Sequence, residues 1–85
     1  MTNPRVEFFL YSRKYCHLCD DFLVKLESLL KGMDYTCHVI DVDENLDLKR
    51  LYGARIPVLV ANNVELCETK FDEKTICQYL ELSSV

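Results

Sequence analysis

The sequence predicts an α/β fold in the order βαβ-α-ββα, with a four-stranded mixed sheet flanked by helices on both faces. Three observations lead to this prediction. An apolar strand (Arg5–Tyr11) is joined to a second strand (Thr36–Val42) by a helix of about fifteen residues. Two short strands then flank an Asn-Asn dipeptide, and an amphipathic helix follows them. A chain of 85 residues has room for one core, so residues 1–85 are expected to form a single domain.

The first strand is apolar at both of its alternating sets of positions. Phe8 and Leu10 fall on one face, and Phe9 and Tyr11 fall on the other. Successive side chains of a strand point to opposite faces, so a strand that is apolar on both faces is expected to be covered on both. The helices are therefore expected on both sides of the sheet.

The first helix, His17–Lys31, follows a polar loop, Ser12–Tyr15. Gly32 is expected to end it, because glycine adopts the left-handed conformation that often closes helices. A helical connection between neighbouring strands makes them parallel, through a right-handed crossover. The helix is predicted from apolar residues that recur at spacings of three and four: Leu18, Phe22, Leu23, Leu26, Leu29 and Leu30.

The second half of the chain begins with a short helix. Asp43 or Asn45 is expected to cap it, and Gly53 to end it. The strands Ile56–Ala61 and Val64–Cys67 come next. The Asn-Asn pair between them tolerates the positive φ angles of a two-residue turn, so these strands are predicted to form a β-hairpin.

The last helix is predicted to run to about Leu82. Asp72 is a favourable N-cap residue. Phe71 before it and Ile76 within the first turns have the spacing of a hydrophobic staple.

Composition and charge exclude several classes of protein. The formal net charge is -4, whereas a nucleic-acid-binding domain needs a basic face. No apolar run approaches the ~20 residues that span a bilayer, and the N-terminus lacks the apolar region of a secretory signal. The five cysteines are odd in number and follow no export signal, so structural disulfides are not expected and most thiols should be reduced. We expect the protein to lie in the cytoplasm and to be a monomer.

Two of the cysteines, Cys16 and Cys19, lie where the first strand turns into the first helix. The N-terminus of a helix carries about half a positive charge and favours a thiolate, so the pKa of Cys16 is expected below the free value of about 8.5. Arg13, Lys14 and a protonated His17 would favour the thiolate further. The geometry assigns attack on a substrate disulfide to Cys16 and resolution of the mixed disulfide to Cys19, one turn inward.

Other interpretations of a Cys-x-x-Cys pair remain open. Structural zinc takes four ligands, and the remaining Cys and His residues fall singly on predicted elements. Covalent haem attachment needs His directly after the second cysteine, where Asp20 stands. Two ordinary buried cysteines are the third interpretation. The same interpretation fits Cys37 and Cys77, whereas Cys67 is also a candidate for glutathionylation or for a bridge to a partner.

The chain resembles the thioredoxin superfamily, and within it the glutaredoxins and a group of short bacterial glutaredoxin-like proteins. Two motifs carry the resemblance. Residues 11–19 are Tyr-Ser-Arg-Lys-Tyr-Cys-His-Leu-Cys, at the first strand-helix junction, and residues 55–60 are Arg-Ile-Pro-Val-Leu-Val, at the start of the hairpin. The resemblance implies a thioredoxin-like fold over nearly the whole chain.

The resemblance also implies roles for single residues. Pro57 would form a cis peptide bond beside the cysteine pair, and the backbone of Ile56 would bind an extended thiol peptide. Arg13 would pair with a glutathione carboxylate. Arg55 stands where typical glutaredoxins have Thr, and it could hold an anionic ligand or screen the thiolate. The Gly-Gly turn that binds glutathione after the hairpin is absent, although Asp72 could replace the family's Asp.

These observations predict a thiol-disulfide oxidoreductase that reduces protein disulfides or glutathione mixed disulfides. No tightly bound cofactor is expected, glutathione is a candidate co-substrate, and neither nucleic acid nor membrane is an expected partner. The alternative is a non-catalytic module that holds an iron-sulfur cluster or zinc through the pair, or an adaptor with inert thiols. The catalytic residues would be Cys16 and Cys19, and the residues expected to contact substrate are Arg13, His17, Arg55, Ile56 and Pro57.

Overall fold

The computed structural model describes residues 6–83. Arg5, which the sequence places in the first strand, lies outside the described residues. Within this range, no helix is both long and apolar enough to span a membrane. The elements are β1 (Val6–Ser12), α1 (His17–Leu29), β2 (Tyr35–Asp41), the 3-10 helix η1 (Val42–Glu44), α2 (Leu46–Tyr52), β3 (Val58–Ala61), β4 (Val64–Glu68) and α3 (Glu73–Ser83).

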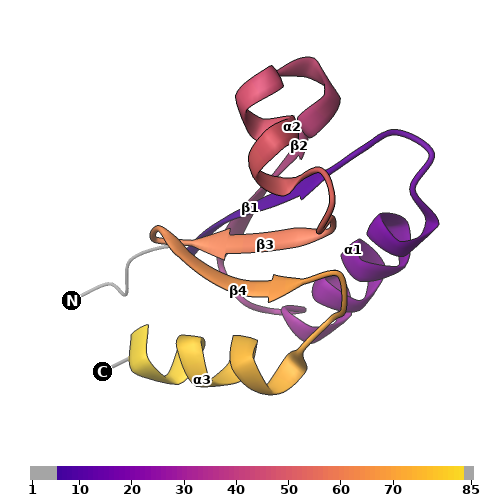
Figure 1. The fold of residues 1–85 in the computed structure, drawn as a ribbon. Helices are drawn as coiled ribbons and strands as arrows, with labels where there is room; N and C mark the ends of the chain where they lie inside the picture. Colours follow the sequence, from indigo (N-terminus) through magenta and orange to yellow (C-terminus); the bar gives the residue numbers. More distant parts are fainter. Residues whose placement is uncertain (1–5, 84–85) are drawn as a thin grey trace.

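The strands form one four-stranded sheet in the order β2-β1-β3-β4 (Figure 1). β1 is parallel to β2 and antiparallel to β3, and β4 is antiparallel to β3. Both Asn62 and Asn63 adopt positive φ, at 50° and 63°. The predicted βαβ unit, β-hairpin and mixed sheet are therefore confirmed.

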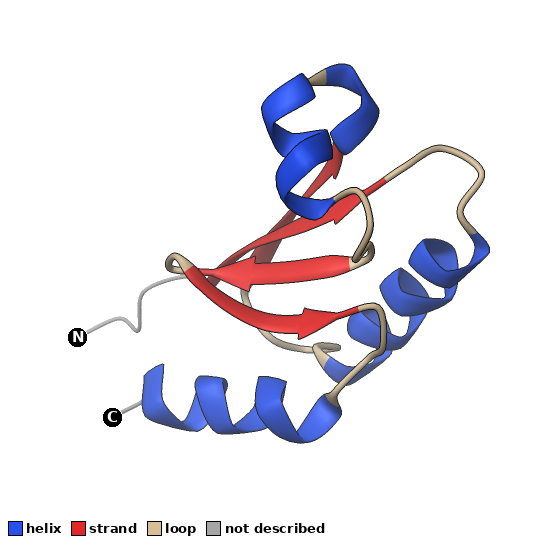
Figure 2. Ribbon diagram, viewed as in Figure 1, coloured by secondary structure: helices blue, strands red, loops and turns tan. Residues whose placement is uncertain are grey.

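Helices lie on both faces of the sheet, as predicted (Figure 2). On one face, Phe8 and Leu10 of β1 belong to a buried core with Phe22 and Leu26 of α1 and Ile76 of α3. This core is continuous from α1 to α3, because β3 and the end of β4 also contribute buried side chains to it.

The opposite face of the sheet is covered more thinly. Tyr11 of β1 stacks on Tyr52 of α2, with ring centroids 4.1 Å apart. Phe9 stacks on His38 of the neighbouring strand β2, at 4.9 Å. Since Phe9 and Tyr11 remain partly exposed, α2 covers only the part of this face near the carboxyl end of β1.

Several boundaries differ from those predicted. β1 continues through Ser12, which is buried. β2 ends at Asp41, because the Asp41 carboxylate accepts a hydrogen bond from the Asp43 N–H at 2.9 Å and starts the turn of η1. α2 is capped by Asn45, the second of the two predicted caps, whose side chain accepts the Leu48 N–H at 3.1 Å.

The predicted strand start at Ile56 is wrong, since β3 begins only at Val58. The Ile56–Pro57 peptide bond is cis, as the resemblance implies. The β4 strand contains a further irregularity. Leu59 pairs with Cys67 but Val60 pairs with Glu65, so an extra residue in β4 places two consecutive buried residues there.

The core predicts a contrast between two positions of α1. Leu26 is fully buried, whereas Val24 is 66% exposed. Leu26→Ala is expected to lower the free energy of unfolding by about 2–5 kcal/mol, because it leaves a cavity in the core between α1 and the sheet. Val24→Ala, the matched control on the same helix, should change it by about 0.5 kcal/mol or less. Urea unfolding measures both, and equal effects would contradict this assignment of the core.

Candidate active site

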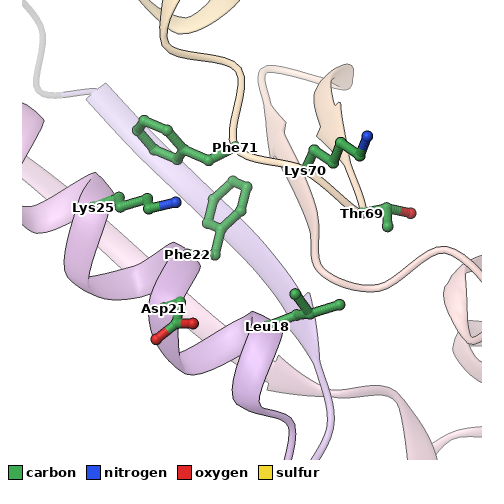
Figure 3. A pocket seen from close by; sticks show the side chains of 7 residues that line it. All are labelled: Leu18, Asp21, Phe22, Lys25, Thr69, Lys70 and Phe71. Atoms are coloured by element: carbon green, nitrogen blue, oxygen red, sulfur yellow. The ribbon is translucent and has the colours of Figure 1, made fainter.

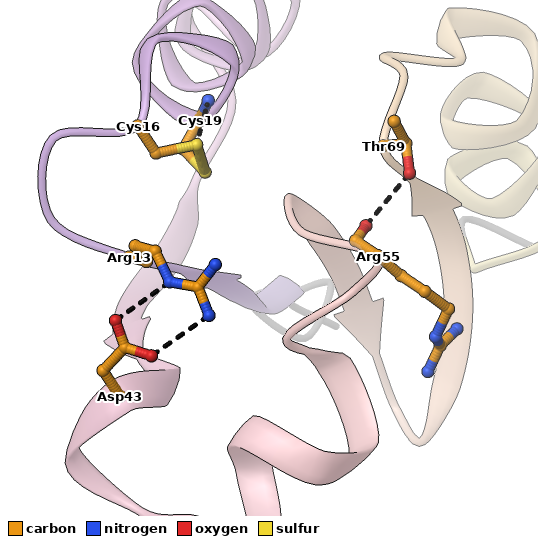
Figure 4. The surroundings of a disulfide bond; sticks show 6 residues. All are labelled: Arg13, Cys16, Cys19, Asp43, Arg55 and Thr69. Atoms are coloured by element: carbon orange, nitrogen blue, oxygen red, sulfur yellow. Dashed lines mark hydrogen bonds and ion pairs between the residues drawn. A yellow bond between two sulfur atoms is a disulfide. The ribbon is translucent and has the colours of Figure 1, made fainter.

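The cysteine pair lies at the junction of β1 and α1, where the sequence predicts it. Cys16 is the N-cap residue of α1 and is partly exposed. Cys19 lies in the first turn and is buried, with 4% of its surface exposed. The two sulfur atoms form a disulfide, and the Cα atoms are 5.2 Å apart (Figure 4). The structure therefore represents the oxidised state of the pair.

The sulfur of Cys16 acts as the cap of α1. It accepts a hydrogen bond from the Cys19 N–H at 3.2 Å, and the Cys16 carbonyl accepts the Asp20 N–H at 3.0 Å. A capping atom lies at the positive end of the helix dipole, beside backbone amides that have no partner within the helix. This position favours negative charge on the Cys16 sulfur when the disulfide is reduced.

Arg13, predicted to bind substrate, makes a two-pronged ion pair with Asp43. Its Nε and Nη2 atoms donate to the two carboxylate oxygens at 2.9 and 3.1 Å (Figure 4). This pair ties the loop that carries Cys16 to η1, thirty residues further along the chain. The guanidinium also lowers the pKa of Asp43, because it hydrogen-bonds to the charged form of the carboxyl group.

The Arg55 side chain points away from the disulfide (Figure 4). Its guanidinium donates to Glu65 at 2.7 Å, to Glu68 at 3.2 Å and to the carbonyl of Leu51 at 2.9 Å. It also lies over the ring of Tyr52, 5.5 Å from the centroid. The side chain thus links α2 to β4, and its contact with a substrate stays a prediction.

The backbone around Pro57 has an open segment. The Thr69 N–H donates to the carbonyls of Arg55 and Pro57, at 3.0 and 2.8 Å. Between them, the N–H and C=O of Ile56 make no hydrogen bond with any other residue in the range 6–83. Pro57 is fully buried, and Ile56 is partly exposed.

The strand register places this open segment at the same edge of the sheet as the cysteines. Tyr11 pairs with Val58, and Val58 pairs with Glu68. The carboxyl end of β1, the start of β3 and the end of β4 therefore meet at one edge (Figure 1). An extended polypeptide that binds there by strand addition would lie next to the disulfide.

The residues inside and beside the pair are exposed. His17 begins α1 and faces solvent. Tyr15 is 99% exposed and adopts a positive φ of 59°. Leu18, the first of the apolar residues from which the helix is predicted, is 58% exposed. The buried stripe begins at Cys19, and the segment after β4 leaves an open groove over Leu18.

Comparison with known proteins identifies the family. The family model of the Glutaredoxin-like domain (DUF836) matches residues 7–81. The chain belongs to this family. The match includes both cysteines and the whole described sheet except its first residue, so it covers every part of the site just described.

Several solved structures are similar to this glutaredoxin-like domain. Protein Ne2328 from Nitrosomonas europaea is 37% identical with a TM-score of 0.81, over 93% of this chain and 98% of that one. Protein XcR50 from X. campestris is 28% identical with a TM-score of 0.67, over 88% and 96%. Thioredoxin 1 from Thermosipho africanus is 23% identical with a TM-score of 0.61, over 93% and 99%, and this likeness shows the fold alone. No curated protein matches the chain.

The other cysteines of the glutaredoxin-like domain are free thiols. Cys67 is buried, its S–H donates to the carbonyl of Asp72 at 3.8 Å, and burial raises the pKa of its thiol. Burial also raises the pKa of Cys37, which is partly buried beside the core. Cys77 is partly buried on α3. Within residues 6–83, no three Cys, His, Asp or Glu side chains form a group that could hold a metal ion.

The ion pair at Arg13 predicts a pH dependence. Since pairing lowers the pKa of Asp43 in the folded state, the pair stabilises the fold above the unfolded pKa of about 3.9, and this contribution is lost as the pH falls through the lower folded pKa. Arg13→Ala should raise the pKa of Asp43 toward about 3.9, as measured by carbon NMR of the carboxyl group. Asp72 is the internal control, because Thr75 lowers its pKa instead. If Arg13→Ala shifted the pKa of Asp72 but not that of Asp43, the assignment of the Asp43 pKa to its pairing with Arg13 would be contradicted.

Proposed function

We propose that this domain is a dithiol thiol-disulfide oxidoreductase that reduces protein disulfides or glutathione mixed disulfides. The observation that carries the proposal is the placement of the pair. Cys16 caps α1 with its sulfur at the positive end of the helix and is partly exposed, while Cys19 is buried one turn away and within bonding distance. An exposed thiolate next to a protected second thiol is the arrangement that disulfide exchange needs.

The reaction proceeds in two exchanges from the reduced form. The Cys16 thiolate attacks one sulfur of the substrate disulfide, the substrate S–S bond breaks, and one substrate thiolate leaves. Cys19 then loses its proton and attacks the Cys16 sulfur, which releases the second substrate thiolate. Two electrons pass to the substrate, whose thiolates take up protons, and the domain is left with the Cys16–Cys19 disulfide. Two external thiols, or a dithiol reductase, return it to the reduced form.

Substrate contacts follow from the open backbone. The free N–H and C=O of Ile56 match an extended peptide on either side of the substrate cysteine. Glutathione remains a proposed co-substrate, although a glutathione carboxylate would meet an Arg13 already paired with Asp43. His17 lies on the exposed surface beside the pair, where a substrate would pass.

The proposal includes a monomeric protein in the cytoplasm. Cys37, Cys67 and Cys77 are all free in the structure, which suits a compartment that keeps thiols reduced.

Alkylation by iodoacetamide tests the nucleophile. In the reduced, metal-free protein, Cys16 should react selectively, with a pH midpoint well below about 8.5, because the end of the helix stabilises its thiolate. Mass spectrometry follows the modification, and Cys19→Ser is the matched variant in which only the partner thiol is removed. A midpoint like that of an ordinary cysteine would contradict the proposal.

Iron or zinc at one equivalent in freshly purified protein would instead support the metal-holding alternative.

Substitution of Cys16 and substitution of Cys19 should affect turnover at different steps. Cys16→Ser is expected to abolish reduction of a protein disulfide, a loss of at least about a thousandfold, because no other described cysteine caps the N-terminus of a helix. Cys19→Ser should still form the mixed disulfide at Cys16 but release product slowly. Insulin reduction measures turnover, and trapping of the mixed disulfide on a gel separates the two steps. If both variants lost the trapped mixed disulfide to the same extent, the assignment of Cys16 as nucleophile and Cys19 as resolving cysteine would be contradicted.

A further inference from the structure

A groove runs along α1 from Leu18, the residue before Cys19. One side is the helix, and the other is the segment that joins β4 to α3 (Figure 3). Its hollow measures about 310 Å³. We call it the α1 groove, and it is lined chiefly by Leu18, Phe22, Lys25, Thr69, Lys70 and Phe71.

The groove is long enough for several residues of a ligand. A second hollow shares Lys25 and Phe71 with the first and continues to Ser28 and Leu29. The rise of a helix is about 1.5 Å per residue, so the stretch from Leu18 to Leu29 is about 16 Å long. An extended peptide covers this distance with about five residues.

The floor of the groove is apolar. Phe22 and Phe71 pack edge to face, with ring centroids 5.1 Å apart. Phe22 is buried and Phe71 is partly exposed, so the floor is anchored in the core and open on one side. Leu18, 58% exposed, extends this apolar surface into the first turn of α1, the end of the helix that Cys16 caps. A bulky apolar side chain laid over this floor would cover the exposed parts of Leu18 and Phe71 and so remove that apolar surface from water.

Two lysines stand on opposite sides of that floor. Lys25 comes from α1 and Lys70 from the segment after β4 (Figure 3). Neither ammonium group makes an ion pair with another residue in the described part of the chain. Asp21 lies on the groove near Leu18, and Glu73 lies at its far end. In a protein with a net charge of -4, these two unpaired lysines are the positive charges of the groove with which a carboxylate can pair.

We propose that the α1 groove binds the substrate polypeptide on one side of its disulfide cysteine, with a bulky apolar side chain over Phe22 and Phe71 and a carboxylate between Lys25 and Lys70. This inference rests on the proposed function and narrows it to protein disulfides whose cysteine has an apolar and an acidic neighbour within about five residues. The covalent bond to Cys16 fixes one end of the polypeptide, so even weak contacts in the groove raise the stability of the mixed disulfide.

Exchange with peptide disulfides tests the groove. In the Cys19→Ser protein, the Cys16 thiolate attacks a symmetric peptide disulfide, one peptide is bound through a new S–S bond, and the other leaves as a thiolate. Peptides with Phe and Glu within four residues of Cys, placed before or after it, are compared with matched peptides that carry Ala and Lys. The Phe-Glu peptide should have an exchange constant about tenfold larger in at least one of the two orders. If the exchange constants of the two peptides differed by less than twofold both with Phe and Glu before Cys and with Phe and Glu after Cys, the inference would be overturned.

Charge reversal provides the matched variants. Lys25→Glu combined with Lys70→Glu should lower the ratio of the two exchange constants by at least about threefold. Both lysines are exposed, so the fold is expected to tolerate the change. Lys31→Glu makes the same charge reversal outside the groove and should keep the wild-type ratio. If the ratio fell equally in the Lys31→Glu variant, the preference for the Phe-Glu peptide would come from the net charge of the protein, and the inference would be overturned.

Two further measurements separate this inference from the proposed function. Exchange with bis(2-hydroxyethyl) disulfide, which is too small to occupy the groove, reports on Cys16 alone, and its failure would count against the proposed function. The Phe-Glu peptide with Ser in place of Cys needs no redox chemistry. Its binding should shift the amide NMR signals of Phe22, Lys25 and Lys70. An absence of shifts together with equal peptide ratios would overturn the groove and leave the proposed function standing.

Discussion

The central position of β1 is the constraint on which the remaining structure depends. β1 pairs with β2 on one side and β3 on the other, so both of its hydrogen-bonding edges are satisfied inside the sheet. Its residues Phe8 and Leu10 are buried against α1. With the strand held on three sides, its carboxyl end has a defined position, and the chain leaves it directly into the loop that carries Cys16. The candidate active site is therefore built on the most constrained element of the fold.

Two sets of polar contacts hold the loop of Cys16 and the segment around Ile56 in place relative to the sheet. The Arg13–Asp43 ion pair ties the Cys16 loop to η1, and Thr69 ties the end of β4 to the carbonyls on both sides of Ile56. Neither contact touches the sulfur atoms. Their effect is geometric, because they hold the loop, the cis proline and the end of β4 at a common edge of the sheet while Ile56 and Cys16 stay accessible.

The site thus combines the helix N-terminus that carries Cys16 with the α1 groove. The helix N-terminus acts on the charge of the sulfur, whereas the α1 groove acts on the identity of the polypeptide attached to it. These two effects depend on different residues. A change in the groove alters the choice of substrate without moving the cap hydrogen bond from Cys19 to Cys16.

The sequence by itself determined the order of the elements, the parallel βαβ unit, the hairpin turn and the position of Cys16 and Cys19, because apolar periodicity and local turn chemistry depend on near neighbours in the chain. Only the tertiary structure decided which partner each long side chain takes. Arg13 meets Asp43 thirty residues away, Arg55 meets Glu65 and Glu68, and Leu18 lies exposed over a groove closed on its other side by Phe71. Flexible cationic side chains and groove walls are set by contacts between segments distant in sequence, and no local pattern encodes those distances.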